Sequence, residues 1–164
     1  MTTFRNIRIK AMALLALALL ASGSVAAAEP APAVTFKIID GRALSVAQLR
    51  GRPLLVVFWA TTCSTCLKEM PQLIELYREL HPRGLEIIGV AMPFDPPNRV
   101  LEVARQRQVP YPVALDIQAE AAAAFGNVWA TPTSFLIAPD GRIVQRKLGP
   151  WNMQSLRDRI QELL

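Results

Sequence analysis

An uninterrupted apolar run, PLLVVFWA, occupies residues 53–60, between a Gly-Arg pair and a polar turn. Apolar residues without alternation indicate a strand that is buried on both faces, as at the centre of a parallel sheet. The next segment, CSTCLKEMPQLIELYRELH, repeats apolar residues at helical spacing. A buried strand that leads directly into an amphipathic helix restricts the chain to a fold in which helices cover a central sheet.

The rest of the chain carries strand and helix signals in alternation. Before the apolar run, a strand near 36–39 turns at Asp40-Gly41, and Ser45 caps a short helix. Prolines and Asn98 mark the start of a later helix, and Asn152 caps the last one. We expect strands at 84–92 and 111–116, helices at 95–108, 117–126 and 152–164, and two strands within 133–149. The predicted fold class is α/β, a mixed sheet flanked by helices, with an N-terminal hairpin.

The first 28 residues have the organisation of a secretory signal peptide. Three basic residues precede an uncharged apolar core, and an Ala-x-Ala cleavage site ends at Ala28. The uncharged stretch 11–28 is just long enough to span a bilayer, so an uncleaved anchor in the membrane is the alternative. No cysteine lies near this segment, which excludes a lipoprotein anchor. We therefore predict a signal peptide over 1–28 and one domain over 29–164.

The charge of the predicted domain is close to balanced. Fifteen of the 18 basic residues and all 13 acidic residues follow residue 28, which leaves a formal charge of +2. The arginines are scattered and form no basic tract, so nothing in the sequence indicates a nucleic-acid partner.

Cys63 and Cys66 are the only cysteines in the chain. A disulfide across a two-residue gap closes almost no loop, which argues against a purely structural role, and a structural zinc site requires four ligands. The helix predicted to begin at Cys63 favours its thiolate and should depress its pKa, whereas Cys66 falls on the apolar face of that helix. An exposed thiol beside a protected one is suited to thiol–disulfide exchange.

Three segments together carry a family resemblance: VVFWATTCSTCLKEMP, ATPTSFLIAPDGRIV and DGRALSVAQLRGRPLL. With them, residues 34–164 resemble the TlpA/ResA-like thiol–disulfide oxidoreductases of the thioredoxin superfamily. The resemblance implies a thioredoxin-like fold with an extra βα unit between Cys66 and Pro132. It implies that Cys63 is the nucleophile and Cys66 the resolving cysteine. It also implies a cis bond before Pro132, which would face the disulfide, and a backbone contact between Thr131 and the substrate.

The same resemblance gives Glu69 a role in proton relay and in tuning the thiol pKa values. A solvated glutamate on a helix surface is the alternative interpretation. Trp59 is expected to support the site by core packing, with one edge toward the disulfide. Val57 stands where thioredoxins carry a buried aspartate, which leaves Glu69 as the candidate relay. Ser64-Thr65 between the cysteines leaves the direction of electron flow open.

These observations predict an exported enzyme that reduces disulfides in periplasmic polypeptides. Its electrons would come from a membrane thiol donor of the DsbD/CcdA kind, because the periplasm is kept oxidising. The clients considered are an apocytochrome c during cytochrome c maturation, a copper-site assembly protein or another oxidised polypeptide. We expect a monomer with no bound cofactor or metal beyond the Cys63–Cys66 disulfide, either free in the periplasm or tethered to the inner membrane.

Three other functions are weighed against this one. A DsbA-like oxidant or isomerase would use the same cysteines at a more oxidising potential. A peroxiredoxin-type peroxidase would require Pro at position 56 and Thr at position 60, where the chain has Val and Ala. A Sco-like copper protein would require a three-residue gap between the cysteines and a distant histidine, and His81 is the only histidine.

Overall fold

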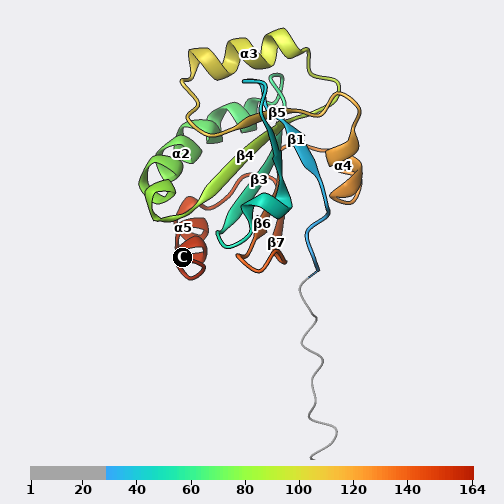
Figure 1. The fold of residues 1–164 in the computed structure, drawn as a ribbon. Helices are drawn as coiled ribbons and strands as arrows, with labels where there is room; N and C mark the ends of the chain where they lie inside the picture. Colours follow the sequence, from blue (N-terminus) through green and yellow to red (C-terminus); the bar gives the residue numbers. More distant parts are fainter. Residues whose placement is uncertain (1–28) are drawn as a thin grey trace, which may run out of the picture.

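The computed structural model describes residues 29–164, and the predicted signal peptide lies outside the described residues. Figure 1 shows a central sheet with helices on both sides. The strands are β1 (Thr35–Lys37), β2 (Ala43–Ser45), β3 (Leu54–Trp59), β4 (Glu86–Ala91), β5 (Val113–Leu115), β6 (Thr133–Ile137) and β7 (Ile143–Leu148). The helices are η1 (Val46–Leu49), α2 (Ser64–Leu80), η2 (His81–Arg83), α3 (Pro97–Gln106), α4 (Glu120–Ala124) and α5 (Met153–Gln161).

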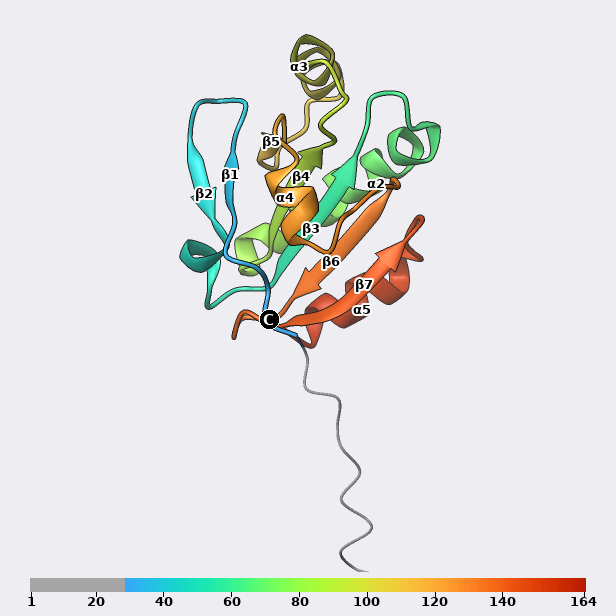
Figure 2. The ribbon, with the colours of Figure 1, turned by 90° about the vertical axis from the view of Figure 1, so that its right-hand side faces the viewer.

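The main sheet has the strand order β5-β4-β3-β6-β7. β3 runs parallel to β4, and β4 parallel to β5, whereas β6 and β7 run antiparallel to their neighbours. Helices α2 and α5 cover one face, and α4 with the N-terminal hairpin covers the other (Figures 1 and 2). The predicted mixed sheet flanked by helices is confirmed.

β3 is the strand predicted from the apolar run, and all six of its residues are buried. Because side chains alternate along a strand, Leu55, Val57 and Trp59 belong to the core under α2 and α5. The intervening residues belong to the core on the opposite face. A strand that lies between two cores has no polar face, which explains its uninterrupted apolar sequence.

The segments before β3 contact both outer strands of the main sheet, β5 and β7. The β1–β2 hairpin lies beside β5, where Ile38 forms a bridge with Ala114. The backbone carbonyl of Glu29 accepts a hydrogen bond from the backbone N of Ile143 at 2.7 Å, at the start of β7. The residues directly after position 28 therefore pair with the β6–β7 hairpin.

Most helix boundaries agree with the expected ones. Ser45 and Asn152 cap η1 and α5 through their side-chain oxygens. α3 begins at Pro97, after Pro96 as the N-cap and without a side-chain cap, so Asn98 is inside the helix and does not start it. Proline suits the first helical position, because its missing N–H would be unpaired there. Within residues 29–164, no helix is both long and apolar enough to cross a membrane.

Candidate active site

One edge of the sheet brings together segments that are far apart in the sequence. The register places Trp59 beside Ala91 and Ala91 beside Leu115, at the ends of the three parallel strands. Phe58 pairs with Thr133 at the start of β6, and Thr133 pairs with Leu148 at the end of β7. The chain leaves β3 at this edge to reach Cys63, so we call it the Cys63 edge.

Cys63 and Cys66 form a disulfide at the start of α2. Cys63 is the N-cap residue, and its Sγ accepts a hydrogen bond from the backbone N of Cys66 at 3.1 Å. Cys63 is half-buried, whereas Cys66 is only 3% exposed and packs in the core under α2. Both the backbone N–H of Cys66 and the positive end of the helix dipole favour a thiolate at Cys63 once the disulfide is reduced. The expected asymmetry of the pair is present.

A buried carboxylate holds the turn that leads to Cys63. Asp95, in the loop after β4, accepts hydrogen bonds from the backbone N of Thr61 at 2.6 Å and from its Oγ1 at 2.5 Å. The backbone N of Cys63 donates to the carbonyl of Ala60 at 3.0 Å within the same turn. Asp95 was not among the site residues predicted from the sequence. The sequence feature that could have indicated it is an acidic residue shortly after a buried strand. Such a residue lies where the carboxyl ends of parallel strands meet, at one edge of the sheet.

The Thr131–Pro132 peptide bond is cis, as the resemblance implies. Pro132 is buried directly before β6, on the Cys63 edge, and its carbonyl accepts a hydrogen bond from the backbone N of Gly149 at 2.8 Å. Thr133 Oγ1 donates to the carbonyl of Ala130 at 2.7 Å and closes the preceding turn. The contact of Thr131 and Pro132 with a substrate stays a prediction.

Glu69 is buried, with 4% of its surface exposed, so the alternative of a solvated surface glutamate is wrong. Its Oε1 accepts a hydrogen bond from the backbone N of Trp151 at 2.7 Å, in the segment between β7 and α5. Burial raises the pKa of Glu69 above its ordinary value, and the Trp151 N–H and the charge of Lys147 oppose that shift in part. Its role in proton relay stays a prediction.

Glu69 and Cys66 line the same small internal cavity between α2 and the sheet. Trp59 and Val57 also line it, and Trp59 belongs to the same core cluster as Cys66, so the expected core packing of Trp59 is present. The orientation of its edge toward the disulfide stays a prediction. Glu69 is the only acidic residue of the lining, to which β3 contributes Val57 and Trp59. Burial, and secondarily the charge of Glu69, raises the pKa of Tyr111. The remaining lining residues are Met70, Leu73, Gly89 and Tyr111.

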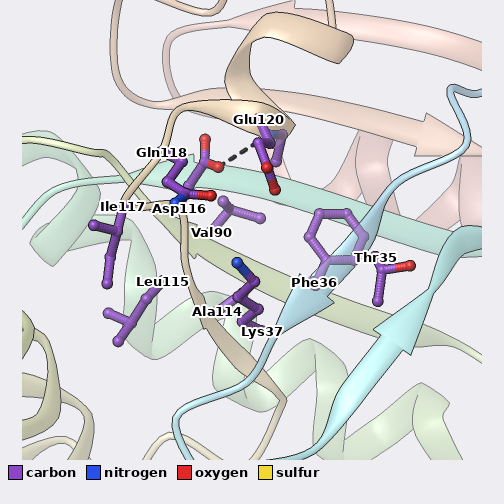
Figure 3. Close-up of a pocket in the computed structure, with 11 residues that line it drawn as sticks. Thr35, Phe36, Lys37, Val90, Ala114, Leu115, Asp116, Ile117, Gln118 and Glu120 are labelled. Atoms are coloured by element: carbon purple, nitrogen blue, oxygen red, sulfur yellow. Dashed lines mark hydrogen bonds between the residues drawn. The ribbon is translucent and has the colours of Figure 1, made fainter.

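A second hollow lies on the opposite face of the sheet, between β1, β5 and the start of α4 (Figure 3). Asp116 is its buried acidic residue, and its two carboxylate oxygens accept hydrogen bonds from the backbone N of Ala121 at 2.9 Å and of Ala122 at 2.8 Å. Both oxygens therefore hold the first turn of α4. We assign Asp116 a structural role and do not include this hollow in the candidate active site.

The described part of the chain holds no group of three or more His, Cys, Asp or Glu residues that could bind a metal ion. His81 follows α2 at the end opposite Cys63, stacks on Tyr77 and hydrogen-bonds the carbonyl of Leu85 through Nδ1 at 2.9 Å. His81 lies fifteen positions after Cys66, about 22 Å further along the helix axis. His81 therefore cannot join the cysteines around one ion.

The Redoxin family model matches residues 26–160. The chain belongs to the redoxin family. It is 31% identical to the thiol-disulfide oxidoreductase ResA of Bacillus cereus over 135 residues, which cover 82% of this chain and 77% of that protein. It is 27% identical to ResA of Bacillus subtilis over 135 residues, which cover 82% of this chain and 74% of that protein.

The fold of this redoxin also matches solved structures. A thiol:disulfide interchange protein of the thioredoxin family from Chlorobium tepidum superposes with a TM-score of 0.77 at 26% identity. The match covers 85% of this chain and 99% of the other. The predicted thioredoxin-like fold and TlpA/ResA-like class are confirmed, and the redoxin is a thiol–disulfide oxidoreductase.

Proposed function

We propose that this redoxin is an exported disulfide reductase that acts through Cys63 and Cys66. The Cys63 thiolate attacks one sulfur of a disulfide in a client polypeptide and displaces the other sulfur as a thiolate. Cys66 then loses its proton and attacks Cys63 Sγ, which releases the second client sulfur. The protein ends as the Cys63–Cys66 disulfide, and the client gains two electrons and, after protonation, two thiols.

The observation that carries the proposal is the unequal exposure of the two sulfur-bearing residues. Cys63 is accessible at the N-cap of α2, where the helix end stabilises a thiolate. Cys66 is almost fully buried, so a client disulfide reaches Cys63 first. A buried second thiol is protected from outside reagents until a mixed disulfide forms next to it.

In this proposal Glu69 takes the proton that Cys66 must lose. Two observations support this role: both residues line the same cavity, and burial raises the pKa of Glu69, which makes its carboxylate a stronger base. A carboxylate in this cavity also disfavours a neighbouring thiolate. Because a less stable reduced form is a better electron donor, this charge supports the reducing direction.

The N-terminal sequence supports export and is compatible with a tether. Glu29, the first described residue, pairs beside Ile143 at the edge of the sheet opposite Cys63. We propose an exported polypeptide with an accessible disulfide as the client and a membrane dithiol donor of the DsbD/CcdA class as the source of electrons.

The test is the state of the two cysteines in the cell, measured by thiol trapping together with the redox potential of the purified protein against glutathione. A reducing couple that is mostly in the dithiol form supports the proposal. An oxidising couple that stays in the disulfide form would make the protein a DsbA-like oxidant instead. A Cys66→Ser variant should accumulate mixed disulfides with clients, whereas Cys63→Ser serves as the control that cannot start the reaction.

A further inference from the structure

Two buried side-chain atoms within residues 29–164 have no hydrogen-bond partner in the protein, Ser134 Oγ and Trp151 Nε1. Trp151 is the residue whose backbone N donates to Glu69 Oε1. Ser134, in β6, is 0% exposed. Buried polar groups normally have a partner in the protein or in ordered water, so these two atoms indicate a polar region inside the core.

Strand register places Ser134 on the face of the sheet that Glu69 covers. Val57 pairs with Ser134, and Ser134 pairs with Lys147. Directly opposite residues of neighbouring strands point to the same face, so these three form a row across β3, β6 and β7. Val57 lines the cavity that Glu69 and Cys66 share. The row therefore runs from that cavity, past the Ser134 hydroxyl, to the half-buried Lys147 on the outer strand.

Lys147 is the cation that acts on Glu69. The titratable groups nearest to Glu69 on the surrounding elements are Cys66 and Lys68 of α2, Tyr111 before β5, Lys147 of β7 and Arg157 of α5. Lys68 is exposed, and Arg157 forms an ion pair with a carboxylate of α2. Burial raises the pKa of Glu69, whereas the Trp151 N–H and the charge of Lys147 lower it.

A carboxyl group that is to accept the proton of Cys66 must first be ionised, and burial alone favours its protonated form. A cation beside the cavity offsets that effect. The Ser134 hydroxyl lies between Val57 and Lys147 in the row and can donate one hydrogen bond while it accepts another. Ordered water can join polar groups that do not touch.

We propose that Ser134 and Lys147 are positioning residues for Glu69: the Lys147 ammonium is its counter-charge, and the Ser134 hydroxyl, through ordered water, links the two. Together they keep Glu69 ionised until Cys66 attacks Cys63. In that step the S–H bond of Cys66 breaks and a carboxyl O–H bond forms on Glu69. The electron pair left on the Cys66 sulfur forms the disulfide and expels the client thiolate. The inference rests on the proposed role of Glu69 as proton acceptor.

The first test follows the carboxyl carbon of Glu69 by NMR as the pH of the oxidised protein is varied, because disulfide-bonded cysteines do not ionise. Lys147→Met should raise the pKa of Glu69 by about half a pH unit or more. Lys147→Arg keeps the charge and should titrate like the wild type. Lys37→Met is the matched control, because Lys37 is exposed on β1 beside the hollow of the opposite face. An unchanged Glu69 titration in Lys147→Met would overturn the inference.

The same titration tests Ser134. Ser134→Ala should raise the pKa of Glu69 by a smaller amount than Lys147→Met, and it should lower the urea midpoint of unfolding, because a linked hydroxyl is lost. Ser134→Thr keeps the hydroxyl and should restore the titration even where its extra methyl group lowers stability. A hydroxyl without any partner gives the opposite result, since its removal then leaves the titration unchanged and raises the urea midpoint. That result would overturn the link through Ser134.

The second test measures the step that Glu69 serves. The reduced protein is mixed with an aryl disulfide that releases one coloured thiolate when Cys63 attacks and a second when Cys66 attacks. Lys147→Met should shift the pH profile of the second release to higher pH by the same amount as the Glu69 titration. In a Glu69→Gln background, Lys147→Met should have no effect on that profile. An equal shift with and without Glu69 would mean that Lys147 acts on the thiols directly and would overturn the inference.

The inference and the proposed function fail in different measurements. An oxidising potential would overturn the reductase and leave the NMR titration of Glu69 unaffected. A second release with the same pH profile in Glu69→Gln as in the wild type would overturn Glu69 as the proton acceptor. A profile that depends on Glu69, together with a Glu69 pKa that Lys147→Met and Ser134→Ala do not move, would overturn the inference alone.

Discussion

Arg107 donates a hydrogen bond from Nη1 to the carbonyl of Leu67 at 2.9 Å, in the first half of α2. That carbonyl has no partner within the helix, because the residue four positions later is Pro71, which has no N–H. Arg107 is the C-cap residue of α3. The hydrogen bond therefore links the βα unit that contains α3 to α2, at the carbonyl that Pro71 leaves without a helical partner.

A double-mutant cycle tests this relationship. Arg107→Ala should lower the free energy of unfolding by about 1 kcal/mol, because the Leu67 carbonyl loses its donor. In a Pro71→Ala background, the new N–H at position 71 can serve that carbonyl, and the same change should have less than half the effect. Urea unfolding of the four proteins gives the coupling energy. A coupling below about 0.3 kcal/mol would mean that the two residues act independently.

Removal of the Asp95 carboxylate should loosen the turn before Cys63. Asp95→Ala eliminates two charge-assisted hydrogen bonds of a buried group, and we expect a loss of roughly 3 kcal/mol in the free energy of unfolding. Thr61→Val removes one of the two bonds and should have a smaller effect. Glu102→Ala, which breaks an exposed ion pair with Arg99, is the control and should change stability by less than about 0.5 kcal/mol. A similar small change for Asp95→Ala would contradict the structural role of this carboxylate.

The buried Glu69 predicts a pH dependence of stability. Its pKa in the folded protein lies above the ordinary value of 4.5, so folding favours the protonated form. Wild-type stability relative to Glu69→Gln should be greatest at acidic pH, below the pKa of the unfolded chain. It should decline as the pH rises through the folded pKa. Glutamine keeps an oxygen that can accept the Trp151 N–H, so the comparison isolates ionisation.

Urea unfolding of both proteins between pH 4 and pH 8 measures this difference. A difference that stays constant across this range, or that grows in favour of the wild type as the pH rises, would be inconsistent with the raised pKa. The rate at which the thiols of the reduced proteins are alkylated across the same range reports whether Glu69 also tunes the cysteines. Unchanged thiol titration in Glu69→Gln would restrict its role to folding.

The two thiols of the reduced protein should differ in reactivity. Cys63 is half-buried at the N-cap of α2, whereas Cys66 is buried in the core. Iodoacetamide should modify Cys63 at least tenfold faster than Cys66 at neutral pH, as measured by mass spectrometry of proteolytic fragments. The ratio should fall toward one in urea, where both residues are exposed. Equal rates in the native protein would contradict the assignment of Cys63 as the attacking residue.

Much of the site could be predicted because its residues follow one another in the sequence. The apolar run, the paired cysteines and the helical spacing place Cys63 at a helix N-terminus and Cys66 on the inner face. These are local relations between residues a few positions apart. The burial of Glu69 was harder to predict, because helical spacing placed it beside the apolar stripe and could not decide whether another segment covers it.

Long-range contacts could not be predicted in this way. Asp95 meets Thr61 across 34 positions, and Trp151 meets Glu69 across 82. Hydrogen bonds between side chains and distant backbone groups leave no periodic signal in the sequence. They depend on which strand ends lie beside one another, and therefore on the order of the strands in the sheet.

The sequence by itself determined the α/β class, the central buried strand and the cysteine pair at the start of its helix, because hydrophobic spacing and helix capping act over a few residues. The tertiary structure alone decided which residues surround that pair. It placed Asp95 behind the turn and covered Glu69 with the segment before α5. Strand register sets these positions, since it aligns the ends of strands that are distant in the sequence at one edge of the sheet.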